Sequence, residues 1–190
     1  HAKELGYDGV ILFLDELNAA DPAVQAAAYQ LILDRKLGEY RLPDKVALIA
    51  AGNRETDAAP VHTMAAPLAN RFIHVEVDTN LDDWKAWAIS NDISEEVVSF
   101  INFRPELLNK FDPDRRAYPT PRSWSYVSDM IGKCSDAVVE RELINGSVGD
   151  GASSEFFAFQ KVYRHLPDVD DLLENPGRYD VPTDLSVRYA

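Results

Sequence analysis

Two stretches of the chain decide its fold: residues 10–16, which read VILFLDE, and residues 46–53, which read VALIAAGN. Each is a short, continuous run of apolar side chains that ends in polar residues. Continuous apolarity without alternation is typical of strands covered on both faces, as in a parallel α/β sheet. We therefore expect two buried strands whose carboxyl ends carry Asp15, Glu16 and Asn53.

The neighbouring segments alternate between helical and extended patterns. Residues 23–33 are rich in Ala, Leu and Gln and predict a helix, and residues 35–43, which contain Gly38, predict a small hairpin or a loop. A short helix over residues 65–70 and a third strand over the alternating FIHVEV of residues 72–77 follow. This order of elements predicts a parallel, three-layer α/β unit.

Beyond residue 78 the sequence carries no further strand pattern and favours helices. We expect an α/β unit over residues 1–78, an all-helical domain over residues 79–174 and an extended tail over residues 175–190. The expected helices cover residues 81–91, 94–110, 120–133, 136–145, 153–165 and 167–174, with a Gly-rich break at 146–151.

Composition limits the classes of function. The 190 residues include 19 Lys and Arg against 32 Asp and Glu, which gives a net charge of −13. Apolar side chains make up 46% and charged ones 27%, so the chain is globular rather than disordered. The acidic excess argues against nucleic acid as a partner, because phosphate binding needs clustered Lys and Arg.

The cysteine count and the lack of export signals indicate in which cellular compartment the protein is expected. Cys134 is the single cysteine and the four His residues are scattered, so neither a disulfide nor a zinc site is predicted. The longest apolar run, residues 10–14, is too short to span a bilayer. We expect a cytoplasmic protein. Because the sequence begins with His1 rather than Met, we also expect a fragment of a longer protein.

Polar residues at the ends of the two predicted strands are the first candidates for chemistry. At such a position Asp15 can hold Mg²⁺, and the adjacent Glu16 can polarise a water molecule for attack. The amide of Asn53 can orient that water or contact a phosphate. An acidic strand end and an ordinary Gly-Asn turn are the structural alternatives.

Two arginines complete the candidates. Arg71 stands in the run NRF between the predicted short helix and third strand, where a surface arginine is the alternative. Arg122 stands in the first turn of a predicted helix, in the run PTPR. The helix dipole disfavours a cation there, which indicates either tolerance or an anionic partner.

The order of these motifs resembles that of an AAA+ ATPase. Within that superfamily the stretch DELNAADPAVQ (residues 15–25), the hairpin before the second strand and PLANRF (residues 67–72) are most similar to the MoxR-like group. The resemblance covers residues 9 to about 133. It implies the C-terminal part of a P-loop AAA+ parallel-sheet domain followed by an all-helical lid domain.

The resemblance also implies a role for each candidate residue. Asp15 matches the Walker B aspartate that organises Mg²⁺, Glu16 the glutamate that activates water, and Asn53 the sensor 1 residue that reads the γ-phosphate of ATP. Arg71 matches the arginine finger, with Arg54 as the alternative. The lid arginine called sensor 2, which contacts the nucleotide, matches Arg122.

Assembly and partners are likewise implied by the resemblance alone. It implies a homo-oligomeric ring, by family likeness a hexamer, because a finger must reach the neighbouring subunit's nucleotide. Proteins of this group are described as chaperone-like and help partner proteins, often with von Willebrand A-type domains, to mature.

The sequence departs from the family in one large respect. It has no Gly-x-x-x-x-Gly-Lys-Ser/Thr loop, which supplies backbone N–H groups and a lysine to the phosphates. We therefore expect the 190-residue chain to bind ATP poorly or not at all. The alternative is a nucleotide-independent interaction or scaffold module. A metal-dependent nuclease is disfavoured, because no third carboxylate or Lys joins Asp15 and Glu16.

Overall fold

The computed structural model describes residues 6, 8–54, 64, 66–164, 166 and 174–178. The protein is a mixed α/β protein with a small parallel sheet and several helices. It divides into two compact units, His1–Glu76 and Val77–Ala190.

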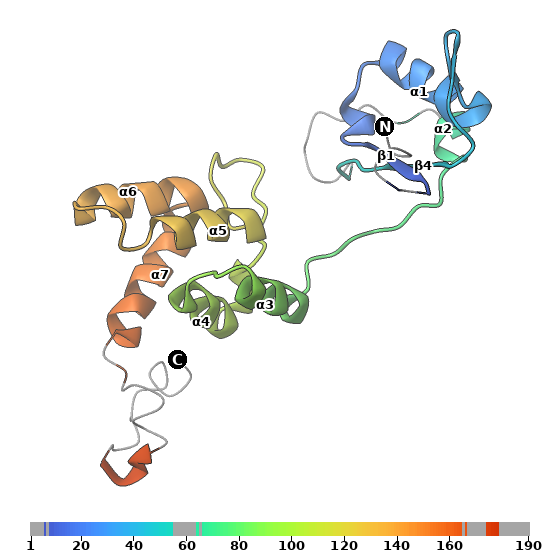
Figure 1. The fold of residues 1–190 in the computed structure, drawn as a ribbon. Coiled ribbons are helices and arrows are strands. Elements are labelled where there is room, and N and C mark those ends of the chain that lie inside the picture. The colour runs from blue at the N-terminus through green and yellow to red at the C-terminus, as the bar shows by residue number, and fades with distance from the viewer. Residues whose placement is uncertain are drawn as a thin grey trace. The chain divides into compact units, whose positions relative to one another are not determined.

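The first unit is built on two parallel strands, β1 (Val10–Leu14) and β4 (Val46–Ala50). Helix α1 (Pro22–Asp34) lies between them in the sequence, so the predicted strand–helix–strand order is confirmed (Figure 1). The strands pair in register, and Leu14 lies opposite Ala50. Their carboxyl ends therefore leave the sheet side by side.

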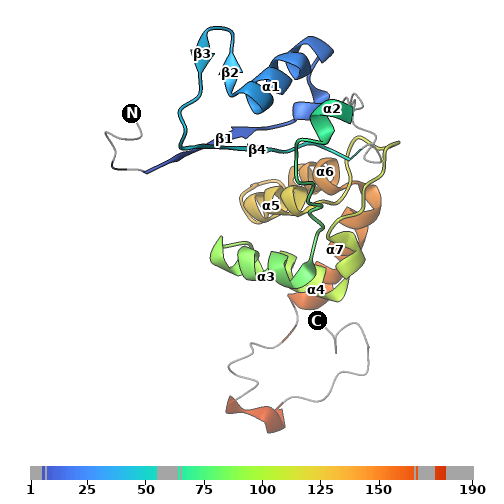
Figure 2. The ribbon, with the colours of Figure 1, turned by 90° about the vertical axis from the view of Figure 1, so that its right-hand side faces the viewer.

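The predicted hairpin between α1 and β4 is also confirmed. It consists of β2 (Lys36–Leu37) and β3 (Tyr40–Arg41), an antiparallel pair next to the end of α1 (Figure 2). The guanidinium of Arg35 donates hydrogen bonds to the carbonyl oxygens of Pro43, at 2.9 Å, and Val46, at 2.7 Å. These bonds fasten the base of the hairpin to the start of β4.

The expectation that both strands are covered on each face is wrong. Ile11 and Phe13 of β1 are 64% and 54% exposed, and Ile49 of β4 is 47% exposed. In the part of the chain that the structure describes, the parallel sheet has only these two strands. Without further strands and the helices that they would bring, the apolar side chains have too few neighbours to bury them.

The predicted third strand over residues 72–77 is also wrong. Helix α2 (Ala66–Ala69) forms as expected, but the following segment joins no ladder among the described residues. Its apolar side chains Ile73, Val75 and Val77 are 94%, 78% and 86% exposed. An alternating pattern makes a segment fit for a sheet, but a strand forms only where a neighbour offers its N–H and C=O groups.

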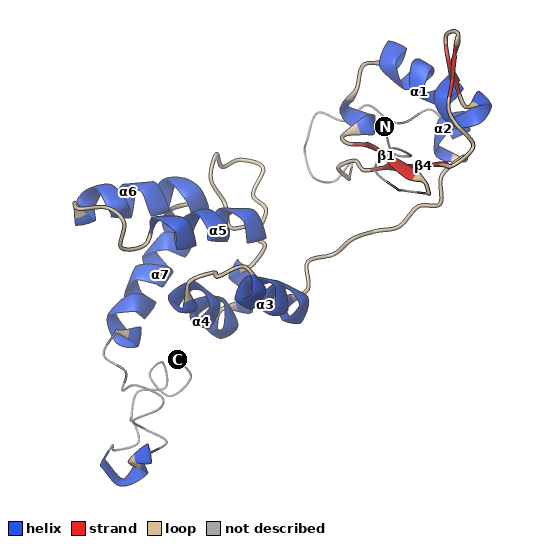
Figure 3. Ribbon diagram, in the orientation of Figure 1, coloured by secondary structure: helices blue, strands red, loops and turns tan. Residues whose placement is uncertain are grey.

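Every regular element among the described residues of the second unit is a helix, and loops connect these helices (Figure 3). The predicted tail contributes a short 3-10 helix, η4 (Pro176–Arg178), and residues 167–173 and 179–190 lie outside the described residues. The long helices of the second unit are α3 (Leu81–Ser90), α4 (Glu95–Phe103), α5 (Pro121–Met130), α6 (Ala137–Val148) and α7 (Asp150–Tyr163).

Proline interrupts the helix that was expected over residues 94–110. Helix α4 ends at Phe103, and Pro105–Leu107 forms a separate 3-10 helix, η3. Proline disfavours helical geometry in the residue before it and cannot donate a backbone hydrogen bond. The sequence contained this signal, and the prediction underestimated it.

The predicted Gly-rich break at residues 146–151 is reduced to a single residue. Gly146 lies within α6, and α7 begins at Asp150 rather than at Ser153. Only Gly149 breaks the helix, with a φ of 83° that side-chain-bearing residues rarely adopt. A Cβ at this position would also lie 2.7 Å from the carbonyl oxygen of Ala117.

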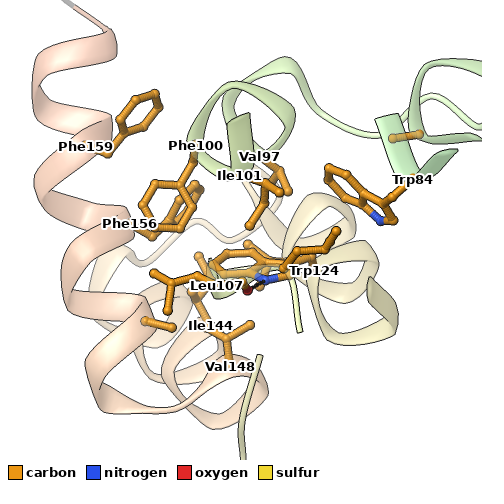
Figure 4. Packing of buried hydrophobic residues seen from close by; sticks show 14 residues of the cluster. Trp84, Val97, Phe100, Ile101, Leu107, Trp124, Ile144, Val148, Phe156 and Phe159 are labelled. Carbon is orange, nitrogen blue, oxygen red and sulfur yellow. Dashed lines mark hydrogen bonds between the residues drawn. The ribbon is translucent and has the colours of Figure 1, made fainter. Parts of the chain in front are cut away.

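The hydrophobic core of the helical unit contains a cluster of aromatic rings among aliphatic side chains (Figure 4). The rings of Phe100, Trp124 and Phe156 lie with their centroids 5.2–5.6 Å apart in tilted or edge-on contacts. The indole N–H of Trp124 donates to the carbonyl oxygen of Leu107 at 2.7 Å, so this buried polar group is satisfied.

Within the described ranges, no helix is both long and apolar enough to cross a bilayer.

Candidate functional site

The carboxyl edge of the parallel sheet brings two polar segments together. The backbone ladder continues past the strands: Ala51 donates to the oxygen of Leu14 at 2.9 Å, and Leu17 donates to the oxygen of Ala51 at 3.0 Å. Glu16 and Asn53 are therefore held at the same edge, as the sequence predicts. In open parallel sheets this edge is where ligands bind.

The turn that carries the two carboxylates combines a left-handed backbone conformation with a local hydrogen bond. Glu16 has φ 52° and ψ 35°, in the left-handed region, and its N–H donates to Oδ1 of Asp15 at 3.0 Å. The next residue, Leu17, is buried, whereas both acidic side chains are exposed. A left-handed glutamate costs about 1 kcal/mol, a kind of strain that is concentrated at functional sites.

The carboxylate of Asp15 fits a magnesium–nucleotide complex better than an all-protein metal site. In the described part of the chain, no group of three or more His, Cys, Asp or Glu side chains could hold a metal ion. Mg²⁺ is usually bound through one or two carboxylates, with waters and substrate phosphates as the other ligands. One exposed aspartate at a strand end satisfies that pattern.

Asn18 is a site residue that the sequence reasoning missed. It lies in the 3-10 helix η1 (Leu17–Ala19), and its Nδ2 donates to the backbone oxygen of Asn53 at 2.6 Å. Its Oδ1 is buried and has no hydrogen-bond partner in the structure as described. A Cβ on Gly52 would lie 2.3 Å from that oxygen. The available signals were a polar residue in the turn after Glu16 and a glycine before Asn53.

Both candidate finger arginines have contacts within the first unit. The guanidinium of Arg71 donates to the oxygen of Pro67 at 2.8 Å and lies 4.9 Å from the ring centroid of Tyr29. Arg54 forms an ion pair of 3.8 Å with Glu76. An incoming phosphate would have to compete with these contacts for either arginine.

Arg122 belongs to the helical unit. It is the second residue of α5, follows Pro121 and is exposed. The described residues give its guanidinium no hydrogen bond or ion pair. A cation without a partner among the described residues, in the first turn of a helix, is compatible with either alternative from the sequence, a tolerated charge or an anionic ligand.

A pocket of about 440 Å³ lies at the start of α7, and no sequence pattern predicts it. The rings of Phe111 and Tyr118 meet edge to face in its wall, with centroids 5.1 Å apart. The charges around it are mixed and favour no single class of ligand; they come from Lys110, Asp112, Arg115, Asp150 and Glu155.

No protein-family model, curated protein or solved structure matches this chain. Among the sequence candidates, Asp15, Glu16 and Asn53 lie at one sheet edge, and Arg71 and Arg54 belong to the same unit.

Proposed function

We propose that this chain is part of a cytoplasmic AAA+ ATPase of the MoxR-like group, which hydrolyses Mg-ATP in a ring and remodels or matures a partner protein. One observation carries the proposal. The parallel register of β1 and β4 holds Asp15, Glu16 and Asn53 at the same carboxyl edge of the sheet. A metal-binding carboxylate, a base and a neutral amide are the groups that phosphoryl transfer to water requires.

Each of these side chains has its own task in the proposed reaction. Asp15 holds Mg²⁺, which supplies positive charge to the phosphate oxygens when it is bound. Glu16 accepts a proton from the attacking water, and its exposure at the turn leaves room for that water. The amide of Asn53 donates to the water or to the terminal phosphate and so fixes the direction of attack.

Arginines provide the remaining positive charge. Arg71 acts as the finger toward the nucleotide of a neighbouring subunit, with Arg54 as the alternative, and Arg122 contacts the nucleotide from the lid. Arginine suits this task because it stays charged and presents a planar fork to phosphate. A finger that acts on a neighbour requires a closed ring, for which we propose a homohexamer. A von Willebrand A-type protein is the proposed partner class.

The phosphate-binding loop must come from sequence outside residues 1–190, since these contain no Gly-x-x-x-x-Gly-Lys-Ser/Thr. We therefore expect the 190-residue chain to bind ATP more weakly than millimolar. Calorimetric titration with Mg-ATP measures this. A submillimolar affinity would contradict the expectation.

The decisive experiment compares ATP turnover by a longer protein, which includes the sequence preceding residue 1, with turnover by its Glu16→Gln form. Turnover should fall by roughly 10²- to 10⁴-fold, because the general base is lost. Binding of a fluorescent nucleotide should persist. Glu39→Gln, in the turn of the hairpin, is the matched control and should keep full turnover. If no form turns over ATP, a nucleotide-independent scaffold becomes the better explanation.

A further inference from the structure

Asn18 connects the two segments that carry the proposed catalytic side chains. It lies on the 3-10 helix that begins directly after Glu16, and its amide nitrogen donates to the backbone oxygen of Asn53 at 2.6 Å. The two residues are 35 positions apart in the sequence. This hydrogen bond is therefore a tertiary link across the carboxyl edge of the sheet.

Gly52 lies close to the side-chain amide of Asn18. A Cβ on Gly52 would lie 2.3 Å from Oδ1 and 2.7 Å from Cγ of Asn18, a distance that real Cβ atoms do not show. The backbone after β4 therefore lies against the side-chain amide of Asn18. Glycine at position 52 permits this approach, and a larger residue would require the Asn18 side chain to move.

The hydrogen bonding of Asn18 differs from that expected of a residue whose only role is to stabilise the fold. Oδ1 of Asn18 is buried without a hydrogen-bond donor in the part of the chain described. A buried oxygen without a donor lowers stability, and an apolar residue would avoid that loss. What the asparagine provides is a donor aimed at one carbonyl.

We propose that Asn18 is a positioning residue, which holds the backbone of Asn53 so that the Asn53 amide faces the water activated by Glu16. The task of Asn53 rests on the proposed ATPase function, whereas the positioning of its backbone does not. Since Asn18 acts through Asn53 and not on the nucleotide, its loss should slow the chemical step and leave nucleotide binding unchanged.

Two substitutions in the longer protein test the role in catalysis. Asn18→Asp keeps the size of the side chain but replaces the donor with an oxygen, and Asn18→Ala removes the group. Both should lower kcat by roughly 10²-fold, the effect of a misplaced reacting group, with KM and nucleotide affinity within about two-fold. Gln30→Ala, an exposed amide on α1, is the matched control and should leave kcat unchanged.

Amide NMR spectra of the 190-residue chain test the positioning itself, without nucleotide. Asn18→Asp should move the backbone signals of Gly52, Asn53 and Arg54, and Gln30→Ala should not. Unchanged signals would overturn the proposal whatever the ATPase assays show. A normal kcat in Asn18→Asp beside an inactive Glu16→Gln would also overturn it, and the proposed ATPase would stand. An inactive parent protein with shifted signals would remove the ATPase and leave the positioning intact.

Discussion

Gly52 lies at the carboxyl edge, where a larger residue would overlap the side chain of Asn18. Alanine there would bring Cβ to 2.3 Å from Oδ1 of Asn18, so either the side chain or the backbone must move. We expect Gly52→Ala to lower the free energy of unfolding of the first unit by about 1–3 kcal/mol, as overpacking of a tight site does. Urea unfolding of the 190-residue chain measures it.

A double-mutant cycle separates this contact from a general effect of the substitution. If the clash is with Asn18, then Asn18→Ala should abolish most of the loss caused by Gly52→Ala. Gly146→Ala serves as the control, because a Cβ on Gly146 meets no atom within 4 Å and lies inside α6. That variant should gain about 0.5–1 kcal/mol. Additive effects at positions 18 and 52 would contradict this explanation.

The sequence predicts which residues lie at the carboxyl edge of the sheet, but it does not predict the contacts that their side chains make. Asp15, Glu16 and Asn53 could be predicted because they end apolar runs, and a parallel register then places them at one edge. The link between Asn18 and Asn53 could not be predicted, because it joins residues that only the fold brings together.

Among the elements, α5 has the most complete set of local signals. Thr120 accepts from the N–H of Ser123 at 3.0 Å, and the hydroxyl of Ser123 accepts from the N–H of Thr120 at 2.8 Å. Pro121 occupies the first helical position, where its missing N–H has no consequence. The start of α5 is thus set within four residues, and the sequence predicted it correctly.

Thr120→Ala should therefore lower the stability of the helical unit by about 1 kcal/mol, since one side-chain cap is lost. Thermal unfolding followed by circular dichroism measures the shift. Ser125→Ala is the control, because Ser125 lies inside α5 and alanine suits a helix interior. A loss no larger than that of the control would show that water replaces the cap.

Other elements depended on information that no local pattern carries. Gly146 and Gly149 are both glycines near the end of α6, yet only Gly149 adopts a positive φ and lies against Ala117. Residues 72–77 alternate as a strand should, but they join no ladder among the described residues. Neither the backbone conformation of Gly149 nor the lack of a strand partner for residues 72–77 can be predicted from the local sequence.

Over the whole molecule, apolar burial is distributed unequally between the two units. The aromatic cluster around Phe100 and Trp124 draws on helices from α3 to α7, and most of its members are almost completely buried. In the first unit the strands expose much of their apolar surface, for example at Ile11 and Phe13. Since local stability follows buried apolar contact, the helical unit should be the more stable one.

Hydrogen exchange followed by mass spectrometry tests this difference. Amides of α4, α5 and α7 should exchange much more slowly than those of β1 and β4, although all are hydrogen-bonded. Phe100→Ala should speed amide exchange in these three helices by roughly 10²- to 10³-fold, because it opens a cavity at the centre of the cluster. Trp87→Ala, at a half-exposed position on α3, should change it little. Equal protection of strands and helices in the unaltered chain would mean that the sheet has cover beyond its two described strands, and the apolar faces of β1 and β4 would then be buried in solution.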